Sequence, residues 1–189
     1  MAYVIVGASA SGINAAKTLR ENDKNIEIIL VSKDEYVYSR CILHHFLDGR
    51  REIEALDFTP KNFFEMYNIK WIKGVEVIGI DVKEKKLKLS NNEDLSYDKV
   101  LLAAGSSSFL PPIENLRTAN NVIGLRNLDD AIKIKEEAKK VKNVAILGAG
   151  LVGVDALAGL LDYDVNITLI EMGDRILPLQ LDSYAANVY

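Results

Sequence analysis

The stretch "NVAILGAGLVGVDALAGLL", residues 143–161, decides the fold through the placement of its glycines. A short apolar run of β-forming residues leads into Gly148, Gly150 and Gly153, and a helical pattern of apolar residues follows them. The next apolar run, "VNITLIE", is typical of a strand and ends at Glu171. This order predicts a βαβ unit. The helix positions expected to point inward are Val154, Leu157 and Leu161.

The spacing within this unit is typical of a dinucleotide-binding turn. In the G-x-G-x-x-G frame the first glycine allows a tight turn, the second lets a pyrophosphate approach, and the third lets the helix pack closely on the strand. Glu171 lies 21 residues after Gly150, near the spacing at which an acidic side chain accepts hydrogen bonds from the adenosine ribose. A carboxylate there repels the 2′-phosphate of NADP, so we expect NAD(H), although Arg175 lies near enough to keep NADP(H) open.

A second glycine turn lies at the beginning of the chain. Residues 3–6 form an apolar run, "GASASG" follows as residues 7–12, and a helical pattern and a strand at residues 26–31 complete another βαβ unit. Ser9 stands at the second glycine position, where it is small enough to let a pyrophosphate approach and has a hydroxyl to donate. The alternative, a glycine turn in an ordinary α/β domain, stays open from this stretch alone.

The residues between the two units predict a small antiparallel meander. "FTPKNFFEMYNIKWIKG", residues 58–74, is typical of a helix that ends before a strand. "VEVIGIDVKEKKLKLS", residues 75–90, alternates apolar and polar side chains around the lysine-rich turn of a hairpin. "YDKVLLAAG", residues 97–105, is typical of a central strand that stops at a glycine.

A Ser/Pro segment, "SSSFLPPIENL" at residues 106–116, has neither a helical nor a strand period. We therefore expect it to connect a first domain over residues 1–108 to a second over residues 109–189. Residues 127–140 follow it with the pattern of a helix that Asn127 caps.

Composition narrows the classes of partner. The 189 residues include 49% hydrophobic and 26% charged residues, which is ordinary for a globular protein with a core. The formal net charge of −4 offers no general attraction to nucleic acid or to an anionic membrane, and no apolar run is long enough to span a bilayer. A single cysteine excludes an internal disulfide framework and fits a reducing, cytoplasmic location.

With both turns and the meander in place, the sequence resembles the FAD-dependent pyridine-nucleotide–disulfide oxidoreductase superfamily. The resemblance is to the branch of NADH oxidases, coenzyme A–disulfide reductases, NADH:rubredoxin reductases and the flavin domain of nitrite reductases. It implies an α/β fold of two consecutive Rossmann-like (FAD/NAD(P)-binding) βαβ units with a small antiparallel meander, the second unit truncated. The motifs that carry it are "YVIVGASASG", "VEVIGID", "LSYDKVLLAAGSSSFLPP", "NVAILGAGLVGVDALA" and "VNITLIEMGDRILPLQLD".

The resemblance assigns the first unit to FAD. Val77 would offer its backbone to the adenine, and Ala104–Gly105 would approach the flavin diphosphate. Ser32 ends the unit where the family often has a glutamate for the FAD ribose, and Asp34 or Glu35 are the alternatives for that role. The residues implied around the FAD pyrophosphate are Gly7, Ala8, Ser9, Ser11 and Gly12.

The resemblance assigns the second unit to NADH. Asp155 falls where the family usually has a glutamate near the nicotinamide. Outside this unit, Arg40 in "YSRCIL" matches an arginine that one branch of the family has near the cofactor. The residues implied in NADH binding are Gly148, Gly150, Val152, Gly153 and Glu171.

The only cysteine, Cys41, lies in "YSRCILHHF", residues 38–46. In one branch of the family a single cysteine in this region faces the flavin and cycles as a sulfenic acid or mixed disulfide. In the other branch a proline stands there, and the cysteine would then be a small packing side chain. His44 and His45 are adjacent, so on a helix they do not share a face and do not form a metal pair, since such ligands need a spacing of three or four residues.

The resemblance implies an enzyme in which NADH passes hydride to FAD and the electrons go on to an acceptor. The acceptor would be oxygen or peroxide, a small disulfide, or a small redox protein, and the full-length protein would be a homodimer. Two other functions stay open: a non-catalytic nucleotide-binding or redox-sensing fragment, and a dehydrogenase with NAD as its single cofactor. Because the family continues beyond Tyr189, we expect the chain to be part of a longer protein and doubt its activity alone.

Overall fold

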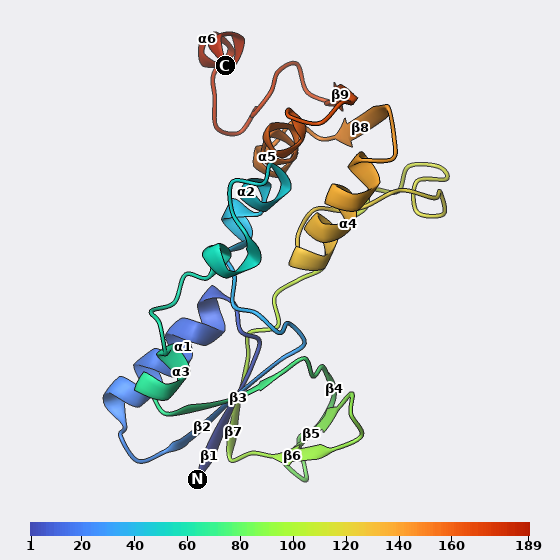
Figure 1. Cartoon of the computed structure of the whole chain (residues 1–189). Helices are drawn as coiled ribbons and strands as arrows, with labels where there is room; N and C mark the ends of the chain where they lie inside the picture. The colour runs from blue at the N-terminus through green and yellow to red at the C-terminus, as the bar shows by residue number, and fades with distance from the viewer. The chain divides into compact units, whose positions relative to one another are not determined.

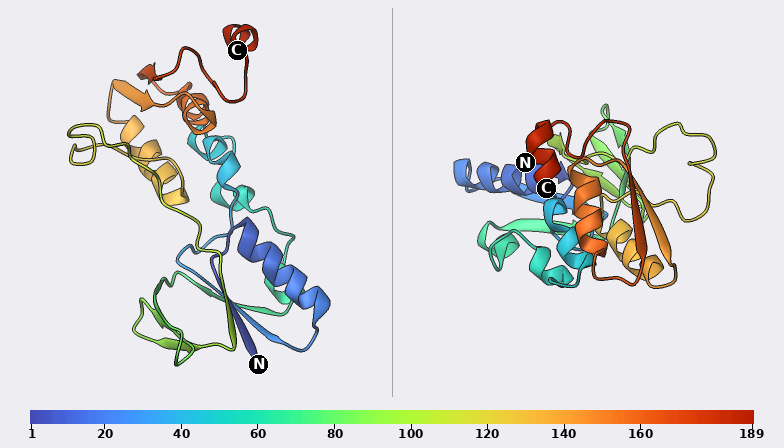
Figure 2. Two further views of the ribbon diagram at one scale, coloured as in Figure 1. Left: turned by 180° about the vertical axis from the view of Figure 1, so that it is seen from behind. Right: turned by 90° about the horizontal axis from the view of Figure 1, so that it is seen from above.

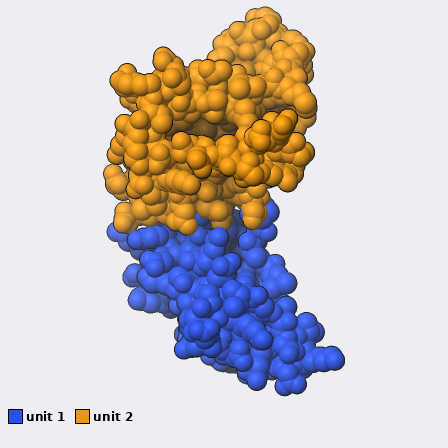
Figure 3. All heavy atoms as spheres, turned by 90° about the vertical axis from the view of Figure 1, so that its right-hand side faces the viewer, with its two compact units in different colours: residues 1–39, 57–106 blue, residues 40–56, 107–189 orange.

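The computed structural model describes residues 1–189 and divides them into two compact units. The first unit comprises residues 1–39 and 57–106, and the second comprises residues 40–56 and 107–189 (Figure 3). The last boundary falls at the beginning of the Ser/Pro segment. Residues 40–56 pack with the second unit, although they come before most of the first unit in the sequence. The assignment of one nucleotide to residues 1–108 and another to residues 109–189 stays a prediction.

The first unit is built on a parallel sheet with the strand order β3-β2-β1-β7 (Figures 1 and 2). The chain runs from β1 through α1 into β2, which is the βαβ unit predicted from the first glycine turn. The elements are β1 (Ala2–Val6), α1 (Ala10–Asn22), β2 (Glu27–Ser32), α3 (Phe63–Met66), β3 (Ile69–Lys73) and β7 (Lys99–Leu102).

Alternate residues of the central strands are buried on opposite faces of this sheet. Ile5 and Leu30 pack in a cluster with residues of α1 and α3, and both are fully buried. Val4 and Val31 point the other way, into a cluster that includes Leu87 of the antiparallel meander. Strands buried on both faces read as continuous apolar runs, which explains why β1 and β2 lack an alternating pattern.

The meander is a three-stranded antiparallel sheet, as predicted. Its strands are β4 (Val77–Asp81), β5 (Lys86–Leu89) and β6 (Asp94–Ser96), and the lysine-rich residues 82–85 form the exposed turn between β4 and β5. The expectation that residues 97–105 form a central strand is wrong. In this chain β7 pairs only with β1 and lies at the edge of the sheet, and Leu102 is 63% exposed.

The second unit contains the other predicted βαβ arrangement, in which β8 and β9 form a two-stranded parallel sheet. The prediction that Leu161 points inward from this helix is wrong, because α5 ends at Leu160 and Leu161 is 66% exposed. Asn127 is the N-cap of α4, as predicted, and it also forms a capping box with Asp130. The elements are η1 (Arg40–Ile42), α2 (His44–Leu47), η2 (Ile53–Leu56), α4 (Leu128–Ala138), β8 (Asn143–Leu147), α5 (Leu151–Leu160), β9 (Asn166–Ile170) and α6 (Ser183–Val188).

The side chain of Arg20 links the end of α1 to the loop before β3 by hydrogen bonds. Its side chain is buried, and Nε and Nη2 donate hydrogen bonds to the carbonyl oxygens of Tyr67 and Asn68 at 2.9 and 3.0 Å. Nη1 donates to the carbonyl oxygens of Asp23 and Lys24. A buried charge is tolerated only with such partners, so this residue satisfies carbonyls from two separate segments.

We expect Arg20→Ala to lower the free energy of unfolding by about 3 kcal/mol, because it removes charged donors and leaves carbonyl groups without partners. Urea unfolding followed by circular dichroism measures the change. The matched control is Lys17→Ala on the same helix, whose partly exposed ion pair with Glu21 is worth at most ~0.5 kcal/mol. Equal midpoints for the two variants would contradict the role given to Arg20.

Candidate functional site

The two glycine turns have the same backbone geometry. Gly7 has a φ of 111° and Gly148 a φ of 100°, a region that residues with a side chain rarely adopt. Each donates its N–H to the strand beyond the helix, Gly7 to the Val31 carbonyl and Gly148 to the Ile170 carbonyl, both at 2.8 Å. The chain thus repeats one turn in two separate units, as the sequence predicts.

The third glycine of each turn permits a close approach of helix and turn. A Cβ atom at Gly12 would overlap the Gly7 carbonyl oxygen, and a Cβ atom at Gly153 would overlap the Gly148 carbonyl oxygen. Gly150 differs, because a Cβ atom there would meet nothing within 4 Å. Gly153 is therefore required by the fold, whereas Gly150 leaves open space in front of the turn.

The helices α1 and α5, which follow the two turns, carry no acidic residue in their first turns. Ser9 is the N-cap of α1 and Gly150 the N-cap of α5. The first amides of a helix lack helical partners, and the helix dipole favours an anion there. Of the other predicted contact residues, Ser11 and Val152 are exposed and Ala8 is buried. This arrangement fits the pyrophosphate of a dinucleotide at each turn.

Glu171 is held against the second turn. Its Oε2 accepts a hydrogen bond from the Ala149 N–H at 2.7 Å, and its Oε1 accepts one from the Gly173 N–H at 2.8 Å. The Ala149 hydrogen bond, followed by that of Gly173, lowers the pKa of Glu171 below its usual value. The carboxylate is therefore ionised at neutral pH, next to the turn whose spacing first indicated its role.

The side chain of Arg175 makes its hydrogen bonds within its own loop. Its Nε and Nη2 donate to the carbonyl oxygens of Leu181 and Pro178, and its Nη1 bonds the Asp174 carboxylate at 2.8 Å. A guanidinium engaged at all three nitrogens is a poor partner for the 2′-phosphate of NADPH. The geometry thus favours the NAD(H) alternative.

Ser32 occupies the position in the first unit that Glu171 occupies in the second. In each unit, the residue before it pairs with the residue before the first glycine. Ser32 is buried, its Oγ donates to the Asp34 carbonyl and accepts from Trp71 Nε1–H at 2.9 Å. Both hydrogen bonds of its hydroxyl are thus made within the first unit, and a ribose contact from Asp34 or the exposed Glu35 stays a prediction.

The structure brings one other predicted FAD segment beside the first turn. The Ala103 N–H bonds the Val6 carbonyl at 2.8 Å, and a Cβ atom at Gly7 would lie 3.3 Å from the Ala104 nitrogen. Gly105 follows with a φ of 72° and open space around it. Val77 begins β4 at an irregularity in the ladder, and its contact with an adenine stays a prediction.

Arg40 and Cys41 lie in the short helical turn η1 of the second unit. The side chain of Cys41 is exposed within residues 1–189, and its role as a packing side chain stays a prediction. A redox role for Cys41 stays a prediction. The chain contains no cluster of three or more side chains suited to a metal ion, and no helix is both long and apolar enough to cross a bilayer.

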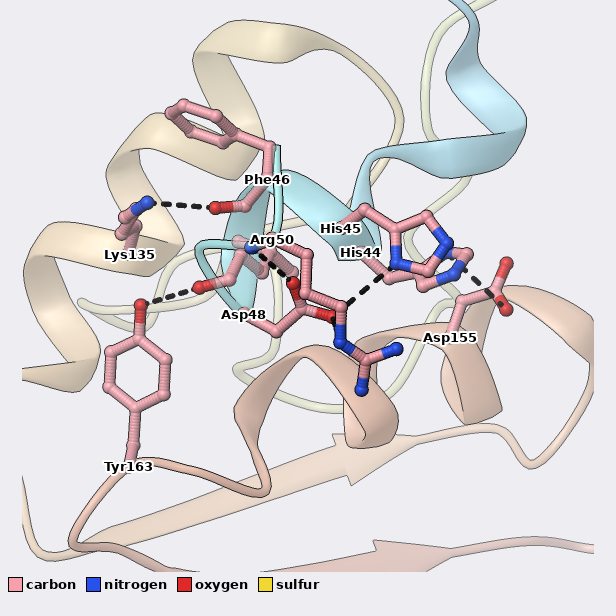
Figure 4. A network of polar contacts seen from close by, with 9 residues as sticks. His44, His45, Phe46, Asp48, Arg50, Lys135, Asp155 and Tyr163 are labelled. Atoms are coloured by element: carbon pink, nitrogen blue, oxygen red, sulfur yellow. Dashed lines mark hydrogen bonds and ion pairs between the residues drawn. The ribbon is translucent and has the colours of Figure 1, made fainter. Parts of the chain in front are cut away.

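No pattern in the sequence predicts that α2, within residues 40–56, packs on α4 and α5. Tyr163 donates its hydroxyl to the Leu47 carbonyl and Lys135 its Nζ to the Phe46 carbonyl, both at 2.8 Å (Figure 4). Leu47 is fully buried, and a Cβ atom at Gly159 would lie 2.8 Å from the Leu47 Cβ atom. Gly159 therefore lets α5 come close to α2, which carries the histidines.

Comparison with known proteins gives consistent matches along the whole chain. The family model described as pyridine nucleotide-disulphide oxidoreductase matches residues 1–189. An NADH oxidase of Methanocaldococcus jannaschii is 31% identical over all of this chain and 44% of its own length, and a rubredoxin-NAD(+) reductase of Alcanivorax borkumensis is 32% identical over 97% and 48%. The structure of a NAD-dependent persulfide reductase from A. fulgidus aligns with a TM-score of 0.85 at 29% identity, over 100% of this chain and 37% of its own. The chain spans less than half the length of these relatives.

Proposed function

Because the chain belongs to the pyridine nucleotide-disulphide oxidoreductase family, we propose that the intact protein is a flavoenzyme that oxidises NADH. The observation that carries the proposal is the repetition of one glycine turn in two units, with an ionised carboxylate at the second turn. A dehydrogenase with one nucleotide needs one such turn. Two turns support two nucleotides, FAD at the first and NADH at the second.

In this proposal each turn binds its nucleotide through the backbone. The amides at the beginning of α1 and α5 hold the two pyrophosphates, and the positive end of each helix dipole favours their charge. Glu171 accepts hydrogen bonds from the ribose hydroxyls of NADH and repels a 2′-phosphate. Ala104–Gly105 lines the diphosphate side of the first turn, and Asp155 on α5 lies near the nicotinamide.

Bound FAD supplies the hydride acceptor and passes electrons one pair at a time or singly to the next acceptor. The names of the relatives, NADH oxidase, rubredoxin-NAD(+) reductase and NAD-dependent persulfide reductase, support three classes of acceptor: oxygen or peroxide, a small redox protein, and a small sulfur compound. We propose that the full-length protein is a cytoplasmic homodimer that uses one of these.

The visible spectrum of the purified full-length protein, with an assay of NADH consumption against each class of acceptor, tests the function. We expect flavin absorption bands and NADH consumption that depends on one class of acceptor. A protein without flavin that still oxidises NADH would favour the single-cofactor dehydrogenase. A protein that binds nucleotide but oxidises NADH with none of the acceptors would favour the sensing fragment.

The role of Cys41 distinguishes between the classes of electron acceptor. If its thiol is the redox centre, the air-oxidised protein carries a sulfenic acid or mixed disulfide. The two electrons of one NADH then reduce it to a thiol, with release of water or of the partner thiol. We then expect Cys41→Ser to keep reduction of the flavin by NADH, to lose turnover of disulfides, and to release peroxide instead of water from oxygen. Mass spectrometry of the oxidised protein and steady-state kinetics measure these changes. A plain thiol with unchanged kinetics in the variant would leave Cys41 without a redox role.

A further inference from the structure

Asp48 is a buried carboxylate that lies against the ring of His45. Its side chain is 1% exposed, and its Oδ2 lies 3.4 Å from His45 Nδ1 (Figure 4). Its Oδ1 accepts a hydrogen bond from the Arg50 backbone N–H at 2.8 Å, and Arg50 Nε lies 3.3 Å from Oδ2. A buried carboxylate needs hydrogen-bond donors on both oxygens, so the His45 ring serves it as a donor.

This contact determines which ring nitrogen of His45 carries a proton. A carboxylate only accepts hydrogen bonds, so the contact requires a proton on Nδ1, in the neutral ring as well as in the cation. In the neutral ring, Nε2 then keeps its lone pair. The His45 side chain is 27% exposed, and no hydrogen bond within the chain occupies its Nε2. This nitrogen is therefore available to accept a proton.

The neighbouring His44 lacks such a partner. Its Nδ1 is buried and makes no hydrogen bond, and the Oδ1 atom of Asp155 lies 3.7 Å away, beyond hydrogen-bonding distance. No hydrogen bond therefore selects the nitrogen that carries the proton on this ring. Of the two adjacent histidines, His45 has the arrangement of an oriented base, in which a carboxylate holds one ring nitrogen and the other nitrogen is free.

Cys41 lies one helical turn before His45. The elements η1 and α2 form a continuous helical run, because Leu43 between them has right-handed helical angles (φ −61°, ψ −28°) and its carbonyl accepts the N–H groups of Phe46 and Leu47. Side chains four residues apart on a helix are neighbours, with Cβ atoms about 5–6 Å apart. The Cys41 side chain is exposed. A thiol, an imidazole and a carboxylate thus follow one another along one side of this run.

We propose that His45 accepts the proton of the Cys41 thiol, and that Asp48 is the positioning residue that keeps His45 Nε2 free for this step. The thiolate is the reactive form of cysteine, and an adjacent base that takes the proton produces it. The proposal deepens the proposed function and rests on it, because it takes Cys41 as the residue that attacks a small disulfide. Asp48 acts through His45 and touches no substrate.

The step is balanced without a further oxidant or reductant. The S–H bond of Cys41 breaks, and the proton goes to Nε2 of His45. The electron pair left on the sulfur forms a bond with one sulfur of the substrate disulfide, whose own S–S bond breaks. The second substrate sulfur leaves as a thiolate and takes the proton from Nε2. The products are a mixed disulfide on Cys41 and one free thiol.

Alkylation of the reduced full-length protein by iodoacetamide, at constant pH, tests the proposal without any nucleotide. Mass spectrometry follows the peptide that contains Cys41. We expect His45→Asn to slow its alkylation at least about ten-fold, because asparagine keeps a donor for Asp48 but has no base in place of Nε2. Asp48→Asn should slow it by a similar factor, because an amide donor facing Nδ1 moves the proton of the neutral ring to Nε2.

The matched control is His44→Asn, which changes the adjacent histidine and should leave the alkylation rate of Cys41 nearly unchanged. Added imidazole should restore the rate in His45→Ala, which would not occur if His45 were needed only for packing. A His45→Asn protein that is alkylated as fast as wild type, or a His44→Asn protein as slow as His45→Asn, would overturn the proposal. The Asp48 and His45 variants are independent, so the test survives if one of them does not fold.

Turnover of a small disulfide with NADH is a separate readout. His45→Asn should lower kcat about 100-fold with little change in KM, while NADH still reduces the flavin at the wild-type rate. Equal kcat values for His45→Asn and wild type would contradict the proposal. A wild-type protein that turns over no disulfide would instead count against this acceptor in the proposed function, and it would leave the alkylation result standing.

Discussion

A Gly153→Val protein is expected to lose measurable NADH binding and about 3 kcal/mol of the free energy of unfolding, because its side chain has no space. A Cβ atom at this position would overlap the Gly148 carbonyl oxygen, which is backbone and cannot rotate away. The helix α5 must then move from the turn, and the amides that face a pyrophosphate move with it. Urea unfolding and fluorescence titration with NADH measure the two losses.

The matched control for this variant is Gly150→Ala in the same turn. Gly150 has an ordinary φ of −78° and open space at its Cβ position, so alanine should leave the unfolding midpoint within about 0.5 kcal/mol of wild type. The new methyl group would lie where a pyrophosphate approaches, and NADH affinity should fall at least about ten-fold. Unchanged NADH affinity in Gly150→Ala would mean that no dinucleotide binds at this turn.

Replacement of Glu171 by alanine has the second largest expected effect, a loss of about ten-fold or more in NADH affinity together with a gain in NADPH affinity. The variant removes the acceptor for the ribose hydroxyls and the repulsion of a 2′-phosphate. It also leaves the Ala149 and Gly173 amides without their present acceptor. The control is Asp162→Ala, an exposed acid just after α5, which should leave the ratio of the two affinities nearly unchanged.

The charge of the Glu171 carboxylate also determines how the preference for NADH over NADPH depends on pH. Hydrogen bonds from Ala149 and then Gly173 hold the pKa of Glu171 below its usual value, so the charge persists when the pH falls to the range in which free carboxylates titrate. The preference for NADH should therefore stay constant from pH ~8 to pH ~5 and weaken only below the usual carboxylate pKa of ~4.3. A wild-type enzyme that binds NADPH as well as NADH would contradict the role of Glu171.

Both glycine turns were predictable because their geometry depends on residues adjacent in the sequence. Gly148 needs a positive φ and Gly153 needs a missing side chain, and each requirement selects glycine at a fixed spacing. Glu171 was predictable for a related reason, since a strand of known length returns the chain to the turn. Local constraints of this kind leave a clear pattern in one sequence.

The packing of residues 40–56 was not predictable, because it depends on pairs far apart in the chain. Leu47 meets Gly159, and His44 meets Asp155, across more than a hundred residues. A glycine inside a helix and a histidine beside another histidine indicate no partner by themselves. The burial of Leu161 was mispredicted because α5 ends one residue earlier, at Leu160, and leaves Leu161 exposed.

The central claim, that the two turns bind two nucleotides that exchange hydride, is tested most directly by titrating the full-length protein with NADH in the absence of oxygen. The flavin absorption bands are the readout. The account predicts that they bleach in proportion to added NADH, with an end point near ~1 NADH per bound flavin, and that NADPH is far less effective. Flavin bands that persist in excess NADH, or a purified protein that contains no flavin, would contradict the claim.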